Sequence, residues 1–284
     1  MFKILRVNHY AKNLFTFAPL FFSFNYTLSS VFDVSIVFIL FSVAASSIYI
    51  FNDLMDINED RQHPTKSLSP LASGQLSKSR AKIIMISLSG SSLVLSFLLC
   101  IELCYILLLY FILNIAYSLK LKKIAIIDIF VLAIGFVLRL FAGASVISAP
   151  LSIWIIIITF LLALFLAIAK RRDDLQLALE DRQTRKNIYG YNLEFINASM
   201  ILMGGVLLVS YILYTVSDNV MAKLNTNHLF ITTFFVILGM LRYMQLTFVE
   251  EISGNPTKIF LNDRFLKLTI LGWLVSFIVI VKVI

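Results

Sequence analysis

Long apolar runs separated by short polar segments constrain this chain more than any other feature of its sequence. A helix needs about 17–25 mostly apolar residues to cross a hydrocarbon core roughly 30 Å thick. Runs of this kind predict an all-α fold, namely a polytopic integral membrane protein with nine transmembrane helices. The predicted spans are residues 14–29, 34–52, 82–100, 103–119, 126–147, 151–169, 195–216, 229–249 and 265–284.

The composition agrees with this class and excludes others. Of the 284 residues, 60% are hydrophobic and 14% are charged, whereas an ordinary soluble domain has about 45–50% apolar and about 25% charged residues. A soluble globular enzyme, a disordered chain and a disulfide scaffold are therefore excluded. Because no polar stretch is long enough to bury a core of its own, residues 1–284 are expected to form a single transmembrane domain.

The distribution of charge predicts the partner and the orientation. Lys and Arg number 24 against 16 Asp and Glu, a net charge of +8, but the basic residues lie in short segments between the apolar runs. We therefore expect a lipid bilayer, and no nucleic acid, as the partner. The N-terminus and every second polar segment after it are basic, so the positive-inside rule places them in the cytoplasm. The expected location is the cell inner (cytoplasmic) membrane.

An acidic stretch follows the second predicted span and carries the strongest chemical signal. Asn52, Asp56 and Asp60 are four residues apart, so they would share one face if the helix continues past Asn52, with Asp53 beside them. Carboxylates one turn apart repel each other, and no lysine four residues further on offsets them. Clustered oxygen ligands of this kind suit Mg²⁺, which takes one or two carboxylates together with waters and a substrate phosphate.

A solvated acidic helix end is the structural alternative for this stretch. His63 and Lys66 follow it directly and would supply contacts to a phosphate. Together with a second polar cluster they favour the functional interpretation, a magnesium site at the cytoplasmic mouth of the helix.

The second cluster surrounds the start of the fifth predicted span. Tyr117 and Lys122 precede this span, Asp128 lies near its first turn, and Arg139 follows three turns later on nearly the same face. Asp128 is partly explained by the helix dipole, but a bare arginine at membrane depth costs several kcal/mol and needs a polar partner. Eleven residues rise about 16 Å, too far for an ion pair, so a bound anion between Asp128 and Arg139 is expected.

Four other polar residues are candidates for substrate contact. Lys170 ends the sixth predicted span, where positive-inside anchoring is the simpler explanation, and Arg242 lies inside the eighth, where it needs a partner. Lys12 and Asn13 lie at the inner end of the first span, where a lysine ordinarily snorkels to the interface. Carboxylates combined with basic residues compose a Mg²⁺–pyrophosphate site, in which the metal neutralises the leaving group and the cations hold the other oxygens.

These motifs resemble the UbiA superfamily of intramembrane prenyltransferases, which has nine transmembrane helices and two aspartate-rich cytoplasmic motifs that bind Mg²⁺ and a diphosphate. The stretch from Asn52 to Asp60 matches its NDxxDxxxD pattern in full. Further segments are similar to the decaprenyl-phosphate phosphoribosyltransferase branch of the superfamily. They are His63-Pro64-Thr65-Lys66, Pro70-Leu71-Ala72-Ser73-Gly74, Tyr117-Ser118-x-x-Leu121-Lys122, Asp128, Arg139, Ala169-Lys170-Arg171-Arg172, Arg242-Tyr243 and the stretch from Asn255-Pro256-Thr257 to Asp263.

For this branch the resemblance implies Mg²⁺-dependent transfer of 5-phosphoribose from phosphoribosyl pyrophosphate to a polyprenyl phosphate, with release of pyrophosphate, for cell-envelope glycan precursors. The nucleophile is already a phosphate anion, so no general base is required. By the resemblance, Asp56, Asp60 and Asp128 are catalytic and hold the metal together with Asn52. The candidate substrate-binding residues are Lys12, Asn13, Asp53, His63, Lys66, Tyr117, Lys122, Arg139, Lys170 and Arg242.

Two departures from the family pattern keep an alternative open. Residues Ser67 to Pro70 lack the arginine that the branch usually has before this proline, and Leu132 stands where aromatic prenyltransferases have the second aspartate of a DxxxD motif. The second departure favours phosphoribosyl transfer. The first leaves open a prenyltransferase that moves an isoprenyl chain from its diphosphate to an aromatic or other acceptor. A transporter or structural membrane subunit is disfavoured by an odd number of spans without an inverted repeat.

Overall fold

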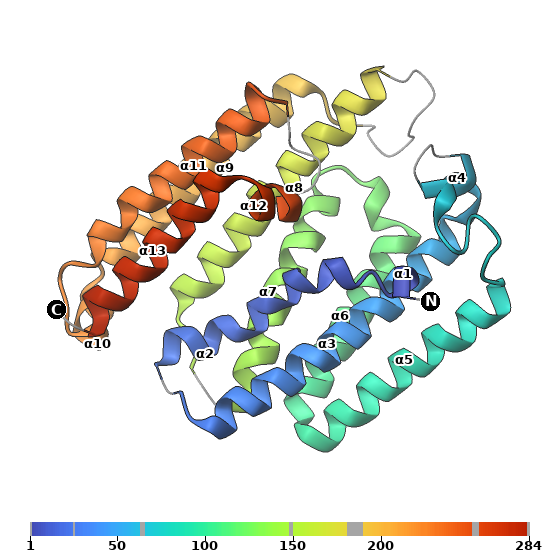
Figure 1. The fold of residues 1–284 in the computed structure, drawn as a ribbon, viewed down its shortest axis with the longest axis horizontal. Coiled ribbons are helices and arrows are strands. Elements are labelled where there is room, and N and C mark those ends of the chain that lie inside the picture. Colours follow the sequence, from blue (N-terminus) through green and yellow to red (C-terminus); the bar gives the residue numbers. More distant parts are fainter. Residues whose placement is uncertain are drawn as a thin grey trace. The chain divides into compact units, whose positions relative to one another are not determined.

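The structure is a computed structural model of the chain, and it describes residues 2–24, 26–62, 66–147, 150–180, 190–251 and 256–282. Within these ranges every regular element is a helix (Figure 1). The chain divides into two compact units, Met1–Leu151 (unit 1) and Ser152–Ile284 (unit 2). The expectation of a single domain stays a prediction.

Unit 1 is built around one long central helix. Its elements are α1 (Phe2–Leu5), the 3-10 helix η1 (Val7–Phe17), α2 (Ala18–Ser23), α3 (Leu28–Met55), α4 (Ile57–Gln62), η2 (Lys66–Leu68), α5 (Lys78–Leu99), α6 (Ile101–Leu119), η3 (Leu121–Lys123) and α7 (Ile127–Ile147). The central helix α3 packs against α5, α6, α7 and η1. Its buried face contributes Val37, Phe41 and Ala44 to the core, which Leu107 of α6 and Leu138 of α7 complete.

Unit 2 contains two pairs of packed helices. Its elements are α8 (Ile153–Glu180), α9 (Leu193–Thr215), α10 (Asp218–Leu224), the 3-10 helix η5 (Leu229–Thr232), α11 (Thr233–Phe248), α12 (Pro256–Asn262) and α13 (Arg264–Lys282). α8 packs against α9, and α11 packs against α13. Phe165 of α8, Met200 of α9 and Phe277 of α13 are among the fully buried side chains of this unit.

Eight helices in the described ranges are long and apolar enough to cross a membrane, so the protein is an all-helical polytopic membrane protein. They correspond to the second through ninth predicted spans, most of them within a few residues at each end. Two ends differ. α3 begins at Leu28, where Thr27 caps the helix by accepting the N–H of Ser30, so the predicted start at residue 34 is wrong. α8 continues to Glu180, well past the predicted end at residue 169.

The first predicted span, residues 14–29, differs most, because no single α-helix runs through it. Instead η1 is followed by α2, which has Pro19 in its first turn and ends at Ser23, before Phe24 in the left-handed conformation. Proline lacks the backbone N–H that a continuous α-helix would use here. At rises of about 2.0 and 1.5 Å per residue, η1 and α2 together reach about 31 Å. A membrane crossing by residues 14–29, which would be the ninth of the protein, therefore stays a prediction.

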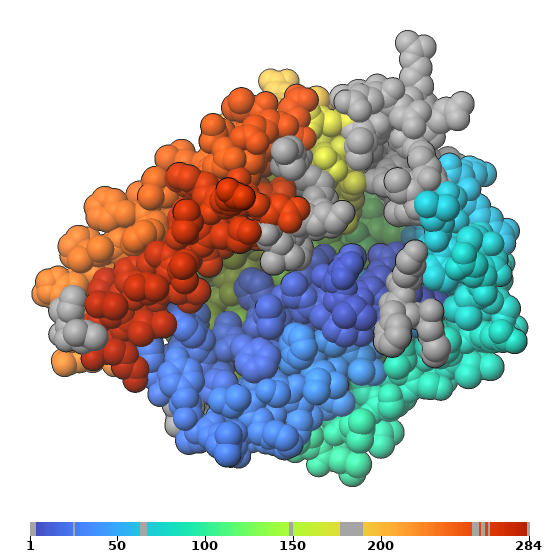
Figure 2. All heavy atoms as spheres, in the orientation of Figure 1, coloured from blue at the N-terminus to red at the C-terminus, as the bar shows by residue number. Residues whose placement is uncertain are grey.

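η1 packs against both α3 and α7. Because 3-10 helices longer than three or four residues are uncommon, tertiary contacts must hold its 11 residues in this form. Tyr10 Oη lies 2.9 Å from Ser46 Oγ, and Asn13 Nδ2 donates to Ser42 Oγ at 2.9 Å. The later residue of η1, Asn13, contacts the earlier residue of α3, Ser42, so the two helices are antiparallel. Figure 2 shows the dark-blue N-terminal segment at the surface beside the lighter-blue α3.

Gly143 lets η1 approach α7 closely. A Cβ placed on Gly143 would lie 1.8 Å from the backbone oxygen of Thr16, an overlap that only movement of the backbone could relieve. At Gly135, two turns earlier on α7, a Cβ would lie 3.5 Å from Arg139 Nη1, which is an ordinary contact. Small residues bring membrane helices together, and Gly143 has this role between α7 and η1.

A chain of hydrogen bonds joins three elements of unit 2. Trp273 Nε1 of α13 donates to Tyr211 Oη of α9 at 2.6 Å, and Tyr211 Oη lies 2.7 Å from Thr232 Oγ1 of η5. Because the Thr232 hydroxyl donates to the Leu229 carbonyl at 2.6 Å, Tyr211 is the donor to Thr232. The chain thus fixes α9, η5 and α13 to one another through a single tyrosine hydroxyl.

Tyr211→Phe should therefore lower the free energy of unfolding by about 1–2 kcal/mol, because the Trp273 N–H loses its acceptor in apolar surroundings. Tyr214→Phe is the matched control, since its ring packs against Tyr211 and its hydroxyl has no hydrogen-bond partner among the described residues. Thermal unfolding of the purified protein in detergent measures both variants. Equal melting temperatures for the two variants would contradict the stabilising role of these hydrogen bonds.

Candidate functional site

The acidic stretch lies where α3 passes into α4. α3 ends at Met55, and Asp56 follows with φ −96° and ψ 8°, outside helical geometry. The helical hydrogen bonding nevertheless continues, because the Asp56 N–H donates to the Asn52 carbonyl at 2.9 Å and the Asp60 N–H donates to the Asp56 carbonyl at 2.8 Å. The structure thus keeps the one-turn spacing that the sequence predicts for these three residues.

Two residues of this stretch are held by the segment around the end of α6. Ser118 Oγ, in the last turn of α6, donates to Asn52 Oδ1 at 3.1 Å. Lys122 of η3 forms a salt bridge with Asp56, in which Nζ lies 2.5 Å from Oδ1. Both charged side chains are largely buried, at 10% and 19% exposure. The structure therefore brings the predicted phosphate contact Lys122 to the predicted metal ligand Asp56.

Asp53 is paired with Arg6, the residue that precedes η1. The Arg6 guanidinium also lies over the ring of Tyr49, 5.4 Å from its centroid. Asp53 is 4% exposed, and a carboxylate so deeply buried requires a cationic partner. Sequence reasoning did not assign Arg6 to the site, because a basic residue ahead of an apolar run has the ordinary explanation of a membrane anchor.

Two further carboxylates of unit 1, Asp60 and Asp128, are buried at 5% and 2% exposure. Asp128 lies in the first turn of α7, where the helix dipole stabilises negative charge. In the described ranges no three His, Cys, Asp or Glu side chains form a ready-made metal cluster. The donors nevertheless fit magnesium, because Mg²⁺ binds oxygen ligands and takes only one or two protein carboxylates beside waters and substrate phosphates.

Arg139 is buried inside unit 1, at 5% exposure. Its guanidinium lies 4.8, 5.5 and 5.3 Å from three ring centroids, those of Phe41, Tyr110 and Phe136. Nε donates to Asn13 Oδ1 at 2.8 Å, and Nη1 donates to the Gly135 carbonyl at 2.6 Å. An amide and a carbonyl therefore accept from this cation, and three rings surround it. The bound anion between Asp128 and Arg139 stays a prediction. Contact of Asn13 or Arg139 with a substrate stays a prediction.

In unit 2, Arg242 has the partner that an intramembrane charge needs. Nη2 lies 2.7 Å from Asp263 Oδ2, and Nη1 lies 2.8 Å from Glu250 Oε1. Nη1 also donates to Gln245 Oε1 at 2.9 Å. The hydrogen bonds from Arg242 hold the pKa of the Asp263 carboxyl below its ordinary value. Arg242 thus ties α11 to the start of α13, and its contact with substrate stays a prediction.

Arg172 anchors the polar end of α8, although the sequence did not single it out. It is buried, and its Nε donates to Asn197 Oδ1 of α9 at 3.0 Å. Its Nη1 donates to Gln176 Oε1 and to the Thr247 carbonyl of α11, both at 2.7 Å. Lys170, the candidate from the same motif, is exposed. A Lys-Arg-Arg run carries no signal for which of its three residues turns inward.

The remaining candidates are described in part or not at all. His63 lies outside the described residues, and so does the side chain of Lys66. Lys12 on η1 and Tyr117 on α6 are half-buried. The polar residues that the structure joins by side-chain contacts at one end of unit 1 are Arg6, Asn52, Asp53, Asp56, Ser118 and Lys122.

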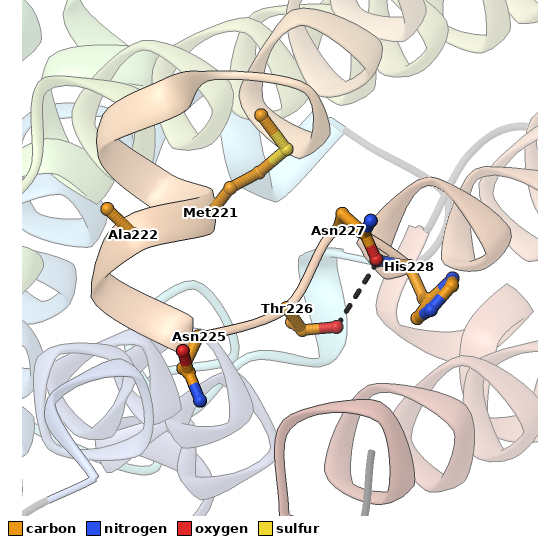
Figure 3. A pocket seen from close by; sticks show the side chains of 6 residues that line it. All are labelled: Met221, Ala222, Asn225, Thr226, Asn227 and His228. Atoms are coloured by element: carbon orange, nitrogen blue, oxygen red, sulfur yellow. Dashed lines mark hydrogen bonds between the residues drawn. The ribbon is translucent and has the colours of Figure 1, made fainter.

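An open pocket lies in unit 2 between α10 and η5 (Figure 3). Within it the His228 N–H donates to Thr226 Oγ1 at 3.2 Å. The pocket lies near the N-terminal end of α11, whereas Arg242 and Glu250 lie near its C-terminal end. None of the candidate residues lines the pocket. The lining residues are Met221, Ala222, Asn225, Thr226, Asn227 and His228.

Relatives of the chain point to one family. The UbiA prenyltransferase family model matches residues 14–268. A decaprenyl-phosphate phosphoribosyltransferase of Mycolicibacterium smegmatis is 32% identical over 248 residues, which cover 85% of this chain and 78% of that protein. A decaprenyl-phosphate phosphoribosyltransferase of Corynebacterium glutamicum is 28% identical over 291 residues, which cover 100% of this chain and 87% of that protein.

Solved structures share the fold. A UbiA homologue from Archaeoglobus fulgidus bound to DMAPP and Mg²⁺ aligns with a TM-score of 0.73 over 99% of each chain, at 19% identity. A structure of digeranylgeranylglyceryl phosphate synthase aligns with a TM-score of 0.64 over 98% of this chain and 96% of that one, also at 19% identity. The family match over most of the chain and the shared helical fold establish that this protein belongs to the UbiA prenyltransferase family.

Proposed function

We propose that the protein is a Mg²⁺-dependent transferase that moves 5-phosphoribose from phosphoribosyl pyrophosphate to a polyprenyl phosphate and releases pyrophosphate. The observation that carries the proposal is the acidic end of α3, where Asp56 is paired with Lys122. The relatives named decaprenyl-phosphate phosphoribosyltransferase support this donor and acceptor. The product would be a cell-envelope glycan precursor. The site would face the cytoplasm at the inner membrane, as the positive-inside rule predicts.

Four oxygen donors of unit 1 would hold the metal. Asn52, Asp56 and Asp60 lie one turn apart along α3 and α4, and Asp128 lies in the first turn of α7. When bound there, Mg²⁺ supplies charge neutralisation for the leaving pyrophosphate. The chain's own task is to present these oxygens in a fixed arrangement, which the Ser118 hydroxyl does for Asn52.

The reaction itself asks for little beyond positioning. An oxygen of the polyprenyl phosphate bonds to the anomeric carbon of the ribose while the bond from that carbon to pyrophosphate breaks, and the electron pair leaves with pyrophosphate. The nucleophile is already anionic, so no proton has to be removed and no general base is needed. Catalysis then comes from orientation and from stabilisation of the leaving charge.

Basic residues would bind the phosphate oxygens. Lys122 is a candidate because it pairs with Asp56 of the acidic stretch, and the sequence predicts Lys66 and His63 as further contacts. The polyprenyl chain would lie against the exposed apolar faces of the membrane helices. Seven further residues stay predicted substrate contacts, namely Lys12, Asn13, Asp53, Tyr117, Arg139, Lys170 and Arg242.

A transfer assay in detergent tests the proposal. Decaprenyl phosphate, phosphoribosyl pyrophosphate and Mg²⁺ should give a lipid product heavier by one phosphoribosyl unit, detected by mass spectrometry and abolished by a chelator. Asp56→Asn should lower the rate about 100-fold or more, because a metal ligand matters at least as much as the groups that support it. Glu59→Gln is the matched control and should keep the rate, because Glu59 is an exposed carboxylate of the same stretch.

Two outcomes would contradict parts of the proposal. Product formed only from an isoprenyl diphosphate and an aromatic acceptor would replace phosphoribosyl transfer by prenyl transfer and leave the family assignment unchanged. A fully active Asp56→Asn variant would exclude the metal site at the end of α3.

Lys122→Met should raise the KM for phosphoribosyl pyrophosphate about tenfold, because a charge-assisted hydrogen bond contributes about 1.5–3 kcal/mol. Lys123→Met removes the same charge from the next residue, which is exposed, and should leave the KM within about twofold. Steady-state kinetics at saturating lipid measures both. If the two variants have the same KM, the phosphate contact lies at another residue.

A further inference from the structure

Arg6 has a local geometry that membrane anchoring does not explain. Its guanidinium pairs with the buried Asp53 and lies over the ring of Tyr49. Its backbone is left-handed, with φ 51° and ψ 47°. Residues other than glycine seldom adopt this conformation, and where they do the surrounding structure holds them in it, often at functional sites.

η1 is the structure that holds Arg6 in place. Tyr10 and Asn13 bond to serines of α3 at successive levels, and Arg6 continues this series to the end of α3. On its other side, η1 rests on α7 where the backbone of Thr16 meets Gly143. The position of the Arg6 guanidinium is therefore set along the whole length of η1.

The turn from Asn52 to Asp56, at the end of α3, is fixed by partners from three separate elements. Asn52 accepts from α6, Asp56 pairs with η3, and Asp53 pairs with the N-terminal segment. These three residues belong to one turn, so loss of Arg6 would remove the cation that pairs with the buried Asp53 carboxylate and let the turn shift. Contacts that orient metal ligands from behind typically change metal affinity 10–100-fold when they are removed.

We propose that Arg6 is a positioning residue of the divalent-metal site. Held by η1, it acts through Asp53 to keep Asn52 and Asp56 in the geometry that binds metal. Residues 6–17 are thus a component of the site as well as a segment of the membrane-embedded unit. The inference rests on the proposed function for the existence of a metal site, and it is independent of the donor and the acceptor.

Binding of Mn²⁺ to the purified full-length protein in detergent tests the inference without any transfer reaction. Mn²⁺ prefers the same oxygen ligands as Mg²⁺, and the loss of its free-ion electron paramagnetic resonance signal measures binding. Arg6→Gly should weaken Mn²⁺ binding about tenfold, since glycine keeps the left-handed turn and removes only the side chain. Arg6→Lys keeps a cation in reach of Asp53 and should restore most of the affinity.

A remote substitution tests the part that η1 plays. Gly143→Ala should displace η1 and weaken Mn²⁺ binding in the same direction as Arg6→Gly, although it lies about 22 Å along α7 from Asp128. Gly135→Ala is the matched control, because its Cβ meets only an ordinary contact, and should bind Mn²⁺ as the wild type does. The double variant Arg6→Gly/Gly143→Ala should bind no more weakly than Arg6→Gly alone, because both changes act on one contact.

Several results would overturn the inference. Wild-type affinity in Arg6→Gly excludes positioning by Arg6, and equal loss in Arg6→Gly and Arg6→Lys excludes a role of its charge. If the losses of Mn²⁺ affinity add in the double variant, Gly143 does not act through η1 and Arg6. If Gly143→Ala does not fold, the comparison of Arg6→Gly with Arg6→Lys tests the inference by itself. Wild-type protein that takes up no Mn²⁺ overturns the inference together with the metal site. Mn²⁺ uptake with no phosphoribosyl product overturns the proposed function alone.

Discussion

Ion pairing of the carboxylates at the end of α3 is the constraint around which unit 1 is arranged. An unpaired charge buried in an apolar interior costs several kcal/mol, and Asp53 and Asp56 lie within one turn of each other. Each is met by a cation from a different segment, Arg6 from the N-terminus and Lys122 from η3. The N-terminal segment runs antiparallel to α3 and brings Arg6 to the end of that helix. The turn between α6 and α7 brings Lys122 to the same end, so both pairs depend on this topology.

The buried cations of the protein differ in how many of their donors are occupied, and this difference bears on function. Arg172 and Arg242 each make three or more hydrogen bonds within unit 2. A planar guanidinium held by several acceptors has few donors left for a substrate. Among the residues that the structure describes, Lys122 makes a single hydrogen bond, to Asp56, through a compact ammonium on a flexible stem. It is therefore the cation best suited to leave a carboxylate for a phosphate oxygen.

Hydropathy predicts eight of the spans because a transmembrane helix satisfies its own backbone and needs only apolar side chains. The spacing of Asn52, Asp56 and Asp60 was equally predictable, because helical hydrogen bonding continues through Asp56. The 3-10 form of η1 and the pairing of Arg6 with Asp53 were not predictable. A long 3-10 helix is stable only through contacts with residues far along the chain, such as Ser46 and Gly143, and a local window contains none of them. The same reason hid Arg172, whose partners come from α9 and α11.

Ser46 of α3 contacts two points of the N-terminal segment. Its Oγ donates to the Leu5 carbonyl at 2.9 Å and lies 2.9 Å from Tyr10 Oη. The backbone next to residue 6 therefore lies at the level of Ser46, whereas Asp53 lies seven residues, or about 10.5 Å, further along α3. Only a long side chain can cover this distance, which explains why an arginine stands at residue 6.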